Sequence, residues 1–480
     1  MPGGEIHLTF KGAQDLYLTD NPQISYFKSV YKRYTNFAME VMELDLNGNS
    51  FQLFSSSSNE RKLSFKIPRN GDLLHYIYLT ADIPDVESTS SEQFQWIRRL
   101  GEYLIKEITI VGGDSRVYNK ITSEYLHVYA ETKIPESKIN AYNEMIGNVP
   151  EMYDPANANS NNGIYPDGST NLPSIRGRKL TIPIPFWFCL TSGNALPLVA
   201  IQKMEFRIDV TLRRTEELFT VINNTADTSS ISTSTFRKRV RPSDSKVTTF
   251  ANNNLSNLLN CFGNFIFLDK EERKRFALTE HKYLMTQYHT NNSNSYTSSN
   301  INLELTDFNH PIQQIYVLLR FIHNENANQW SNYTVWEYGS NGKLESPDTK
   351  NFVSEFVKSH YTLSNPQYYK NPDILDTLEI QLNSDTIKNS VTYSEYFKNI
   401  NPYFFNNCAR DNNSIYSYSY GIDNKKNQPS GSLNYSRIKD KNIIIKKKDN
   451  ISSEVRLIII AENINFFRVL GGMAGTEFEN

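Results

Sequence analysis

The chain has 480 residues, of which 50 are basic and 52 acidic, so its formal net charge is −2. This length is enough for two sizeable hydrophobic cores, and the charge balance lacks the basic excess expected of a protein that coats nucleic acid. Aromatic residues make up 12% of the chain and charged residues only 21%, which favours β-strands joined by polar loops over long surface helices.

Targeting and redox signals are weak. The opening stretch MPGGEIHLTFKG has neither a basic nor an apolar region of a secretory signal, and Pro2 excludes a myristoylation start. No apolar run approaches the roughly 18–20 residues needed to span a bilayer. Cys189, Cys261 and Cys408 are widely spaced and form no CxxC pair. We therefore expect a non-secreted protein with free, buried thiols in a reducing compartment.

The N-terminal region predicts a short strand and then a helix. Ile6–Phe10 has the apolar content of a strand, while Asp20 or Asn21 can cap a helix that starts at Pro22. The spacing of this helix places one apolar stripe on it, formed by Ile24, Phe27, Tyr31 and Tyr34. The stripe fits an arm that docks on a neighbouring subunit equally well as a helix packed on its own domain.

Strands dominate from residue 36 onward. In the first half we predict strands at Phe37–Leu44, Leu63–Ile67, Leu73–Ala81, Leu100–Val111, Leu180–Phe188, Lys203–Leu212 and Cys261–Leu268. Lys203–Leu212 alternates between apolar and polar residues, as a strand with one buried face does. Two segments, 150–173 and about 219–258, read as long loops. The basic run Arg237–Arg241 in the second loop fits a solvated loop better than a nucleic-acid or nuclear-targeting patch.

The second half repeats this style after a charged link at Asp269–Arg275. We predict strands at Phe276–Gln287, Ile301–Leu305, Ile312–Phe321, Leu375–Leu382, Ser414–Ile422, Ile443–Ile445, Val455–Ile460 and Asn465–Met473. The chain thus divides into an arm at 1–35 and two β domains, at 36–269 and 270–480.

An internal repeat supports two copies of one β domain. Leu104–Tyr125 and Leu375–Tyr396 each contain a strand, a turn ending in Asp, and Ser-Glu-Tyr, and Asp114 lies 271 positions before Asp385 (385 minus 114). Both halves also carry, earlier in the chain, an apolar strand with an Ile-Tyr pair. The pairs are Ile77-Tyr78 and Ile315-Tyr316. A long-period repeat of β units in the same order predicts a duplicated domain.

Motifs for catalysis or metal binding are missing from the sequence. It contains no P-loop, GxGxxG, GxSxG or HExxH, and its eight histidines are dispersed. Glu124 and Glu395 belong to separate copies of the repeat, so a structural role is expected for each. We predict no catalytic, cofactor-binding or metal-ligating residues, although a triad assembled across the fold stays open. Among the sequons, Asn332 and Asn412 are named as candidate glycosylation sites, and most of the others are expected to be compositional accidents.

Several segments of the sequence together carry a family resemblance: Gly12–Thr19, Asn21–Ile24, Thr35–Glu40, Pro185–Cys189, Ala195–Leu198, Asp269–Phe276, Phe308–Pro311, Gln428–Arg437 and Arg468–Gly475. These stretches resemble the major capsid proteins of nucleocytoplasmic large DNA viruses. They occur in order along nearly the whole chain. The departures are the 219–258 insertion and the lysine-rich stretch Lys439–Lys448, which leave the loops and inter-subunit contacts less defined than the fold.

The resemblance implies an all-β fold of two tandem eight-stranded jelly rolls, with an N-terminal helical arm and long loop insertions. It further implies a structural protein that forms homotrimers, pseudo-hexagonal capsomers and an icosahedral shell. Minor capsid and penton proteins and a nearby internal membrane would be its neighbours, with assembly in the host cytoplasm. Two alternatives stay open at this point. One is a scaffold of the same fold that is absent from the finished particle. The other is a glycan-binding or glycan-hydrolysing β-sandwich that uses Trp330, Trp336 and Tyr338, although no close carboxylate pair accompanies them.

Overall fold

The computed structural model describes residues 3–47, 60–86, 92–155, 158, 174–223, 259–326, 328–335, 337–338, 344–345, 373–383, 391–407, 414–426, 428–448, 451 and 453–478. The chain separates into two compact units, Met1–Phe37 and Ala38–Asn480. Within these described ranges no helix combines the length and apolarity that crossing a membrane requires.

The N-terminal unit contains two short helices, α1 at Gly3–Thr9 and α2 at Ala13–Thr19. The Asp15 carboxylate accepts a hydrogen bond of 2.9 Å from the Gly12 amide and caps α2. The predicted strand at Ile6–Phe10 is therefore wrong, and so is the predicted helix from Pro22 to Tyr34, where the backbone is irregular. A helix of that length is marginal without a packing partner, and the residues of its apolar stripe are exposed here.

The first barrel consists of two antiparallel sheets. One has the order β1-β11-β4-β8, with β1 at Phe37–Glu43, β11 at Leu259–Leu268, β4 at Leu73–Ile83 and β8 at Arg178–Ile184. The other has the order β2-β3-β9-β6-β7, with β2 at Asp45–Leu46, β3 at Arg61–Lys66, β9 at Phe206–Leu212, β6 at Ile105–Gly112 and β7 at Val117–Thr122. When the two-residue β2 is left out and the other eight strands of these sheets are numbered 1 to 8 along the chain, the two sheets have the orders 1-8-3-6 and 2-7-4-5. This is the strand order of a jelly roll. A small ribbon pairs β5 (Glu92–Trp96) with β10 (Phe219–Asn223).

The second barrel repeats this order in the part of the chain that is described. Its first sheet runs β12-β21-β14-β18, with β12 at His281–Tyr296, β21 at Val455–Leu470, β14 at Pro311–Phe321 and β18 at Tyr416–Ser419. Its second sheet runs β13-β20-β17, with β13 at Asn300–Glu304, β20 at Lys441–Lys447 and β17 at Leu375–Leu382. Four two- to four-residue strands complete it: β15 at Glu337–Tyr338, β16 at Leu344–Glu345, β19 at Leu433–Asn434 and β22 at Met473–Thr476. The chain is thus all-β, with two tandem jelly rolls.

The duplication extends to irregularities of the strands. The pairing of β6 with β9 shifts between Ile105 and Glu107, and the pairing of β17 with β20 shifts between Leu375 and Thr377. The matching bulges make Ile105 and Leu375 equivalent positions of the repeat. The strands therefore correspond at a separation of 270 residues (375 minus 105), one residue shorter than the 271 that the sequence predicts. The Ser-Glu-Tyr triplets keep the longer separation, and the residues between strand and triplet absorb the difference.

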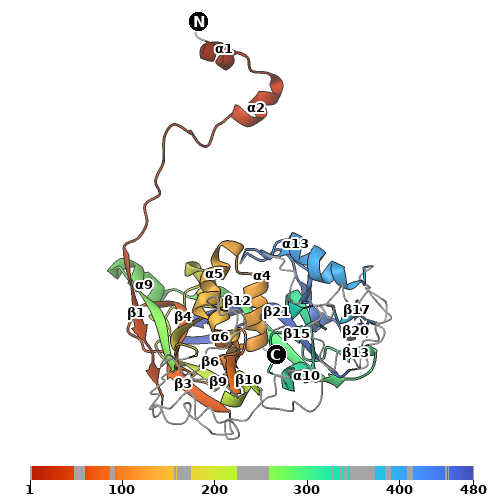
Figure 1. Ribbon diagram of the computed structural model, residues 1–480. Coiled ribbons are helices and arrows are strands. Elements are labelled where there is room, and N and C mark those ends of the chain that lie inside the picture. Colours follow the sequence, from red (N-terminus) through yellow and green to blue (C-terminus); the bar gives the residue numbers. More distant parts are fainter. Residues whose placement is uncertain are drawn as a thin grey trace. The chain divides into compact units, whose positions relative to one another are not determined.

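Short helices connect the strands. They are α3 at Leu100–Leu104, α4 at Ser123–Thr132, α5 at Glu136–Met145, α6 at Pro150–Tyr153, α7 at Trp187–Leu190, α9 at Lys270–Leu278, α10 at Ile322–Asn326, the π-helix η5 at Tyr396–Ile400 and α13 at Asn401–Phe405. Short 3-10 turns lie at Ser192–Asn194, Thr215–Glu217 and Tyr435–Arg437. In Figure 1, α4, α5 and α13 lie along the same edge of the Ala38–Asn480 unit.

These helices correct three predictions. The first turn of the predicted strand Leu100–Val111 is helix α3, the end of Leu180–Phe188 is helix α7, and helix α9 occupies the charged link. Helices α4 and α5 were not predicted. A signal for α4 is present, because the Thr122 hydroxyl caps the helix by accepting a hydrogen bond of 3.4 Å from the Tyr125 amide.

The core contains the apolar face of most predicted strands, but Phe37, Met39 and Val41 on β1 are exposed. On β9 the alternation is confirmed, since Phe206, Ile208, Val210 and Leu212 are buried and Arg207 is exposed. Of the cysteines, Cys189 and Cys261 are free thiols, and Cys408 lies outside the described residues. Burial raises the pKa of Cys189 to about 12, which keeps this thiol protonated and unreactive near neutral pH.

Candidate functional site

The two barrels share one continuous hydrophobic cluster. From the second barrel, the side chains that join the first barrel's core are Met285, Tyr288, Tyr316, Leu318, Tyr333, Ile415, Ile458, Ile460, Phe467 and Val469. Phe467 on β21 is fully buried, and its ring centroid lies 5.3 Å from that of Trp187 and 5.7 Å from that of Tyr118. The outer face of the β12-β21-β14-β18 sheet is therefore covered by the first barrel.

Helix α4 forms the polar side of this junction. The Tyr125 ring stacks on Tyr288 with centroids 3.9 Å apart, and its hydroxyl donates a 2.9 Å hydrogen bond to the Glu462 carboxylate. The Lys133 ammonium, just past the end of α4, lies 3.1 Å from the other Glu462 oxygen. One turn before Lys133, Tyr129 lines a small cavity together with Tyr288 and Glu462. One face of helix α4 in the first barrel thus packs on the strand pair β12 and β21 of the second barrel.

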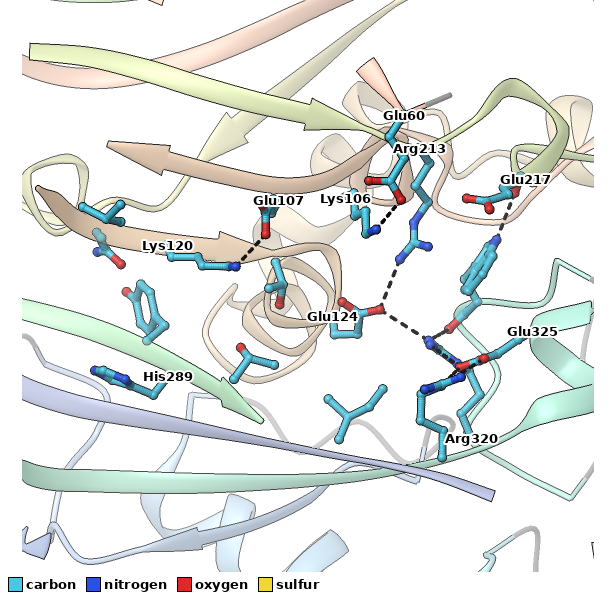
Figure 2. A pocket seen from close by; sticks show the side chains of 18 of the residues that line it. Glu60, Lys106, Glu107, Lys120, Glu124, Arg213, Glu217, His289, Arg320 and Glu325 are labelled. Atoms are coloured by element: carbon cyan, nitrogen blue, oxygen red, sulfur yellow. Dashed lines mark hydrogen bonds and ion pairs between the residues drawn. The ribbon is translucent and has the colours of Figure 1, made fainter. Parts of the chain in front are cut away.

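A buried ion network crosses the junction beside α4. Glu124 accepts from Arg213 of the first barrel at 3.2 Å and lies 3.6 Å from Arg320 of the second (Figure 2). Arg320 in turn donates to Glu325 at 2.7 Å, and Arg456 donates to the same carboxylate at 2.8 Å. Burial acts to raise the pKa of Glu124, but the charges of Arg213 and then Arg320 outweigh it and hold this pKa below its ordinary value.

Trp330 connects the same network to the first barrel. Its indole N–H donates a 2.9 Å hydrogen bond to the Glu217 carbonyl, and the Arg213 guanidinium lies 4.1 Å from its ring centroid. This placement assigns Trp330 to the junction rather than to a sugar-binding platform. Trp336 lies outside the described residues, and Tyr338 lies on β15.

A cavity of about 660 Å³ opens next to the network (Figure 2). Five glutamates line it, and each forms an ion pair: Glu60 with Lys106, Glu107 with Lys120, Glu124 with Arg213, Glu217 with Arg214, and Glu325 with Arg320. The pKa of Glu60 is lowered chiefly by its hydrogen bond from Lys106, and that of Glu124 lies below its ordinary value beside Arg213 and Arg320, which makes both carboxylates poor general bases. Among the described residues, no group of three or more His, Cys, Asp or Glu side chains is arranged to hold a metal ion.

His127 gives this junction a defined response to acid. The imidazole is fully buried, and its Nδ1 lies 2.9 Å from the Tyr103 hydroxyl, which lies 3.0 Å from the Tyr333 hydroxyl of the second barrel. Burial, and then the charges of Arg99 and Arg320, lower the pKa of His127 well below its ordinary 6.5. The folded chain therefore holds His127 neutral under conditions in which the unfolded chain would protonate it.

We expect stability to be retained above pH 6.5 and to fall as the pH drops below that value. One such group lowers the free energy of unfolding by at most about 1.4 kcal/mol per pH unit. In His127→Gln this part of the pH dependence should be absent. Urea unfolding of both chains at a neutral and a mildly acidic pH measures it, and equal slopes in the two chains would contradict the assignment.

The residues that the sequence named as candidate sites differ in where they lie and in how exposed they are. Asn332 is fully buried, and its side-chain carbonyl accepts hydrogen bonds from the amide and the hydroxyl of Thr334. A glycan needs an accessible amide, so this placement argues against modification of Asn332 in the folded chain. Asn412 lies outside the described residues. The arm residues Ile24, Phe27, Tyr31 and Tyr34 do not form a helix but are all strongly exposed.

The junction residues Arg213, Arg320, Glu325 and Arg456 were not predicted. They are scattered charged residues whose partners lie far away in the sequence, and no local spacing connects them. Glu124 was expected to be structural, and it is buried in an ion network, whereas its repeat counterpart Glu395 is exposed.

Comparisons with known proteins agree along the whole chain. A family model described as the major capsid protein N-terminus matches residues 25–269, and one described as the large eukaryotic DNA virus major capsid protein matches residues 272–475. The major capsid protein of Pyramimonas orientalis virus is 27% identical over 483 aligned residues, covering 100% of both chains. That of Phaeocystis pouchetii virus is 26% identical over 549, also covering 100% of both.

Solved structures share the fold. A chain of the PBCV-1 virus capsid superposes with a TM-score of 0.69 at 22% identity, covering 95% of this chain and 100% of that chain. The Faustovirus major capsid protein superposes with a TM-score of 0.65 at 14% identity, covering 96% and 94%. With its two tandem jelly rolls and both family models matched in order, this chain belongs to the major capsid protein family of large eukaryotic DNA viruses and has their structural role in the capsid.

Proposed function

We propose that three copies of this chain associate into a capsomer with a pseudo-hexagonal outline, and that such capsomers tile an icosahedral shell. The observation that carries the proposal is the duplication of the barrel, with the same strand order and matching bulges in both copies. Two barrels per chain give a trimer six similar towers. A six-fold outline tiles a plane, so nearly equal contacts can repeat across a facet. In this proposal the two barrels of each chain are the domains at 36–269 and 270–480.

The role is structural and involves no catalysis. The glutamates of the junction cavity are all held in ion pairs, and the cavity lies between two barrels that pack through a shared core. Such a network stabilises the relative position of the barrels, which a tile needs more than it needs mobility. Assembly takes place in the host cytoplasm, and the assembled protein is located in the virion capsid.

The N-terminal arm supplies contacts to other components. It carries exposed apolar side chains along residues 16–34, including Tyr17, Phe27 and Tyr31. An exposed apolar surface of this extent marks an interaction site. Its partners are neighbouring capsomers, minor capsid and penton proteins, and the inner side of the shell near the internal membrane.

Native mass spectrometry of the purified chain, followed by electron microscopy of assembled material, tests the proposal. A stable trimer that forms hexagonally packed sheets or shells is expected. A monomer at all concentrations, or a closed oligomer whose copy number is not a multiple of three, would contradict it.

Deleting residues 1–34 should separate folding from assembly. None of the described residues 3–34 is buried, so the free energy of unfolding should stay within about 0.5 kcal/mol of that of the full chain. Sheet or shell formation should be lost or strongly reduced. A large fall in stability would show that the arm belongs to a core, and normal shells would show that it is dispensable.

A further inference from the structure

The intrachain junction uses one face of the helical segment that follows Ser-Glu-Tyr. Its contact residues are Tyr125, Tyr129, Thr132 and Lys133, spaced as neighbours on one side of a helix. Tyr125 stacks on Tyr288, Lys133 pairs with Glu462, and the Thr132 hydroxyl contacts that of Tyr316. This face of the first barrel is therefore covered by the second barrel of the same chain.

In the described part of the second barrel, three of the four corresponding positions hold exposed apolar side chains, while the fourth, Tyr396, packs against the core of its own barrel. At the 271-residue separation of the Ser-Glu-Tyr triplets (396 minus 125), the counterparts of the four contact residues are Tyr396, Ile400, Tyr403 and Phe404. They lie on η5 and α13, and Ile400, Tyr403 and Phe404 are 38%, 71% and 62% exposed. In the first copy of the repeat this face makes an interface, whereas in the second it is an exposed apolar surface.

The receiving surface is duplicated too. In the second barrel, Tyr316 on β14 pairs across the sheet with Ile460 on β21, and the first barrel buries both completely. In the first barrel the counterpart of β14 is β4, where Tyr78 pairs with Phe262 on β11. The rings of Tyr78 and Phe262 stack with centroids 5.4 Å apart. Both are only half-buried, and the neighbouring Tyr76 is 39% exposed.

The polar partners change together between the two surfaces. Glu462 follows Ala461, which pairs with Ile315, and Asn264 follows Gly263, which pairs with Ile77. Asn264 is thus the counterpart of Glu462, as Phe404 is the counterpart of Lys133. The buried ion pair of the intrachain junction is replaced by an apolar group on one surface and a neutral amide on the other. Asn264 is buried and contacts the Met39 sulfur of its own chain, so at this position neither surface would bury an unpaired charge against the other.

We propose that the Ile400-Tyr403-Phe404 surface of one copy packs on the Tyr78-Phe262 surface of the first barrel of a neighbouring copy. The contact reproduces between chains the junction that the structure shows within the chain, and it rests on the proposed trimer. It joins two different surfaces head to tail, so each copy donates one and receives one. Contacts of this kind close into a ring when the rotation per copy is right.

Two single variants and their mixture test the contact. Phe404→Asp damages the donating surface, and Tyr78→Asp damages the receiving surface. An interface-centre aromatic replaced by a charge should weaken trimer formation at least about tenfold for either variant. Met473→Asp, at an exposed apolar position on β22, is the matched control and should keep the wild-type trimer. Native mass spectrometry reads the oligomers.

The mixture distinguishes this geometry from a symmetric one. Phe404→Asp keeps an intact receiving surface and Tyr78→Asp an intact donating surface, so together they should form a one-to-one heterodimer, which also shows that both variants are folded. Trimers of unchanged stability in both variants would overturn this inference while leaving the proposed trimer in place. Monomeric variants that form no heterodimer would overturn the head-to-tail pairing. A wild-type chain that does not trimerise would instead refute the proposed function.

Discussion

Phe467→Ala is expected to lower the free energy of unfolding by about 3–5 kcal/mol, as truncation of a fully buried aromatic residue does. Phe467 belongs to the second barrel but lies within the core cluster of the first, in contact with Tyr118 and Trp187. Alanine would leave a cavity where the outer face of the second barrel's sheet packs into the first barrel's core, and the surrounding strands could close it only partly. Denaturant unfolding followed by tryptophan fluorescence measures the loss.

The neighbouring residue provides the matched control. Phe466 points to the other side of the same strand, is only half-buried, and contacts Phe478 and Lys282. Phe466→Ala should cost about 1 kcal/mol or less, because partly exposed side chains lose less buried area on truncation. Equal losses for the two variants would show that Phe467 is not part of the packed junction between the barrels.

Glu124→Gln is expected to lower the free energy of unfolding by about 3 kcal/mol, since removal of one partner leaves buried charge uncompensated. The amide keeps the shape of the side chain but removes the charge that Arg213 and Arg320 share. Glu107→Gln is the control, because Glu107 lines the same cavity but pairs with the half-exposed Lys120. Its cost should stay below about 1 kcal/mol.

The pH dependence of the Glu124 effect has a definite sign. Because its folded pKa lies below the ordinary 4.5, the stabilisation is present above about pH 4.5 and is lost as the pH falls through the folded pKa. The difference between wild type and Glu124→Gln should therefore shrink in acid. A difference that does not depend on pH would show that the loss comes from packing rather than charge.

Periodicity was sufficient for most strands of both barrels. The alternation in Lys203–Leu212 and the repeat around Ser-Glu-Tyr are local patterns that burial on one face of a sheet imposes. The repeat also predicted the duplication, which the matching strand orders confirm. The predicted separation of 271 is one residue too long for the strands, whose matching bulges at Ile105 and Leu375 lie 270 positions apart (375 minus 105). The sequence did not reveal this, because a bulge has no reliable local signal.

The errors concentrate where tertiary packing decides the structure. The Ile24–Tyr34 stripe has helical spacing but no surface to pack on within its unit, while α1 and α2 form from stretches with a weaker pattern. Helix α4 is buried on nearly all sides. Its polar residues Glu124, His127 and Glu131 meet buried partners rather than solvent, so the pattern does not mark a surface helix. The ion network was out of reach because its members come from both barrels and meet only in the folded chain.

The helical segments that follow Ser-Glu-Tyr in the two barrels have different surroundings. The copy of the Ser-Glu-Tyr helix that lies inside the chain is joined permanently, with a buried ion pair at its edge. The copy at the far end remains apolar and exposed. If the proposed contact forms, the duplicated domain supplies one junction within the chain and one between chains.

Electron cryo-microscopy of shells assembled from this chain tests the central claim most directly. The account predicts capsomers with six towers, in which three chains each contribute two adjacent barrels and α13 of one chain faces β4 and β11 of the next. Capsomers in which each tower is a separate chain, or in which α13 faces solvent in every copy, would contradict it.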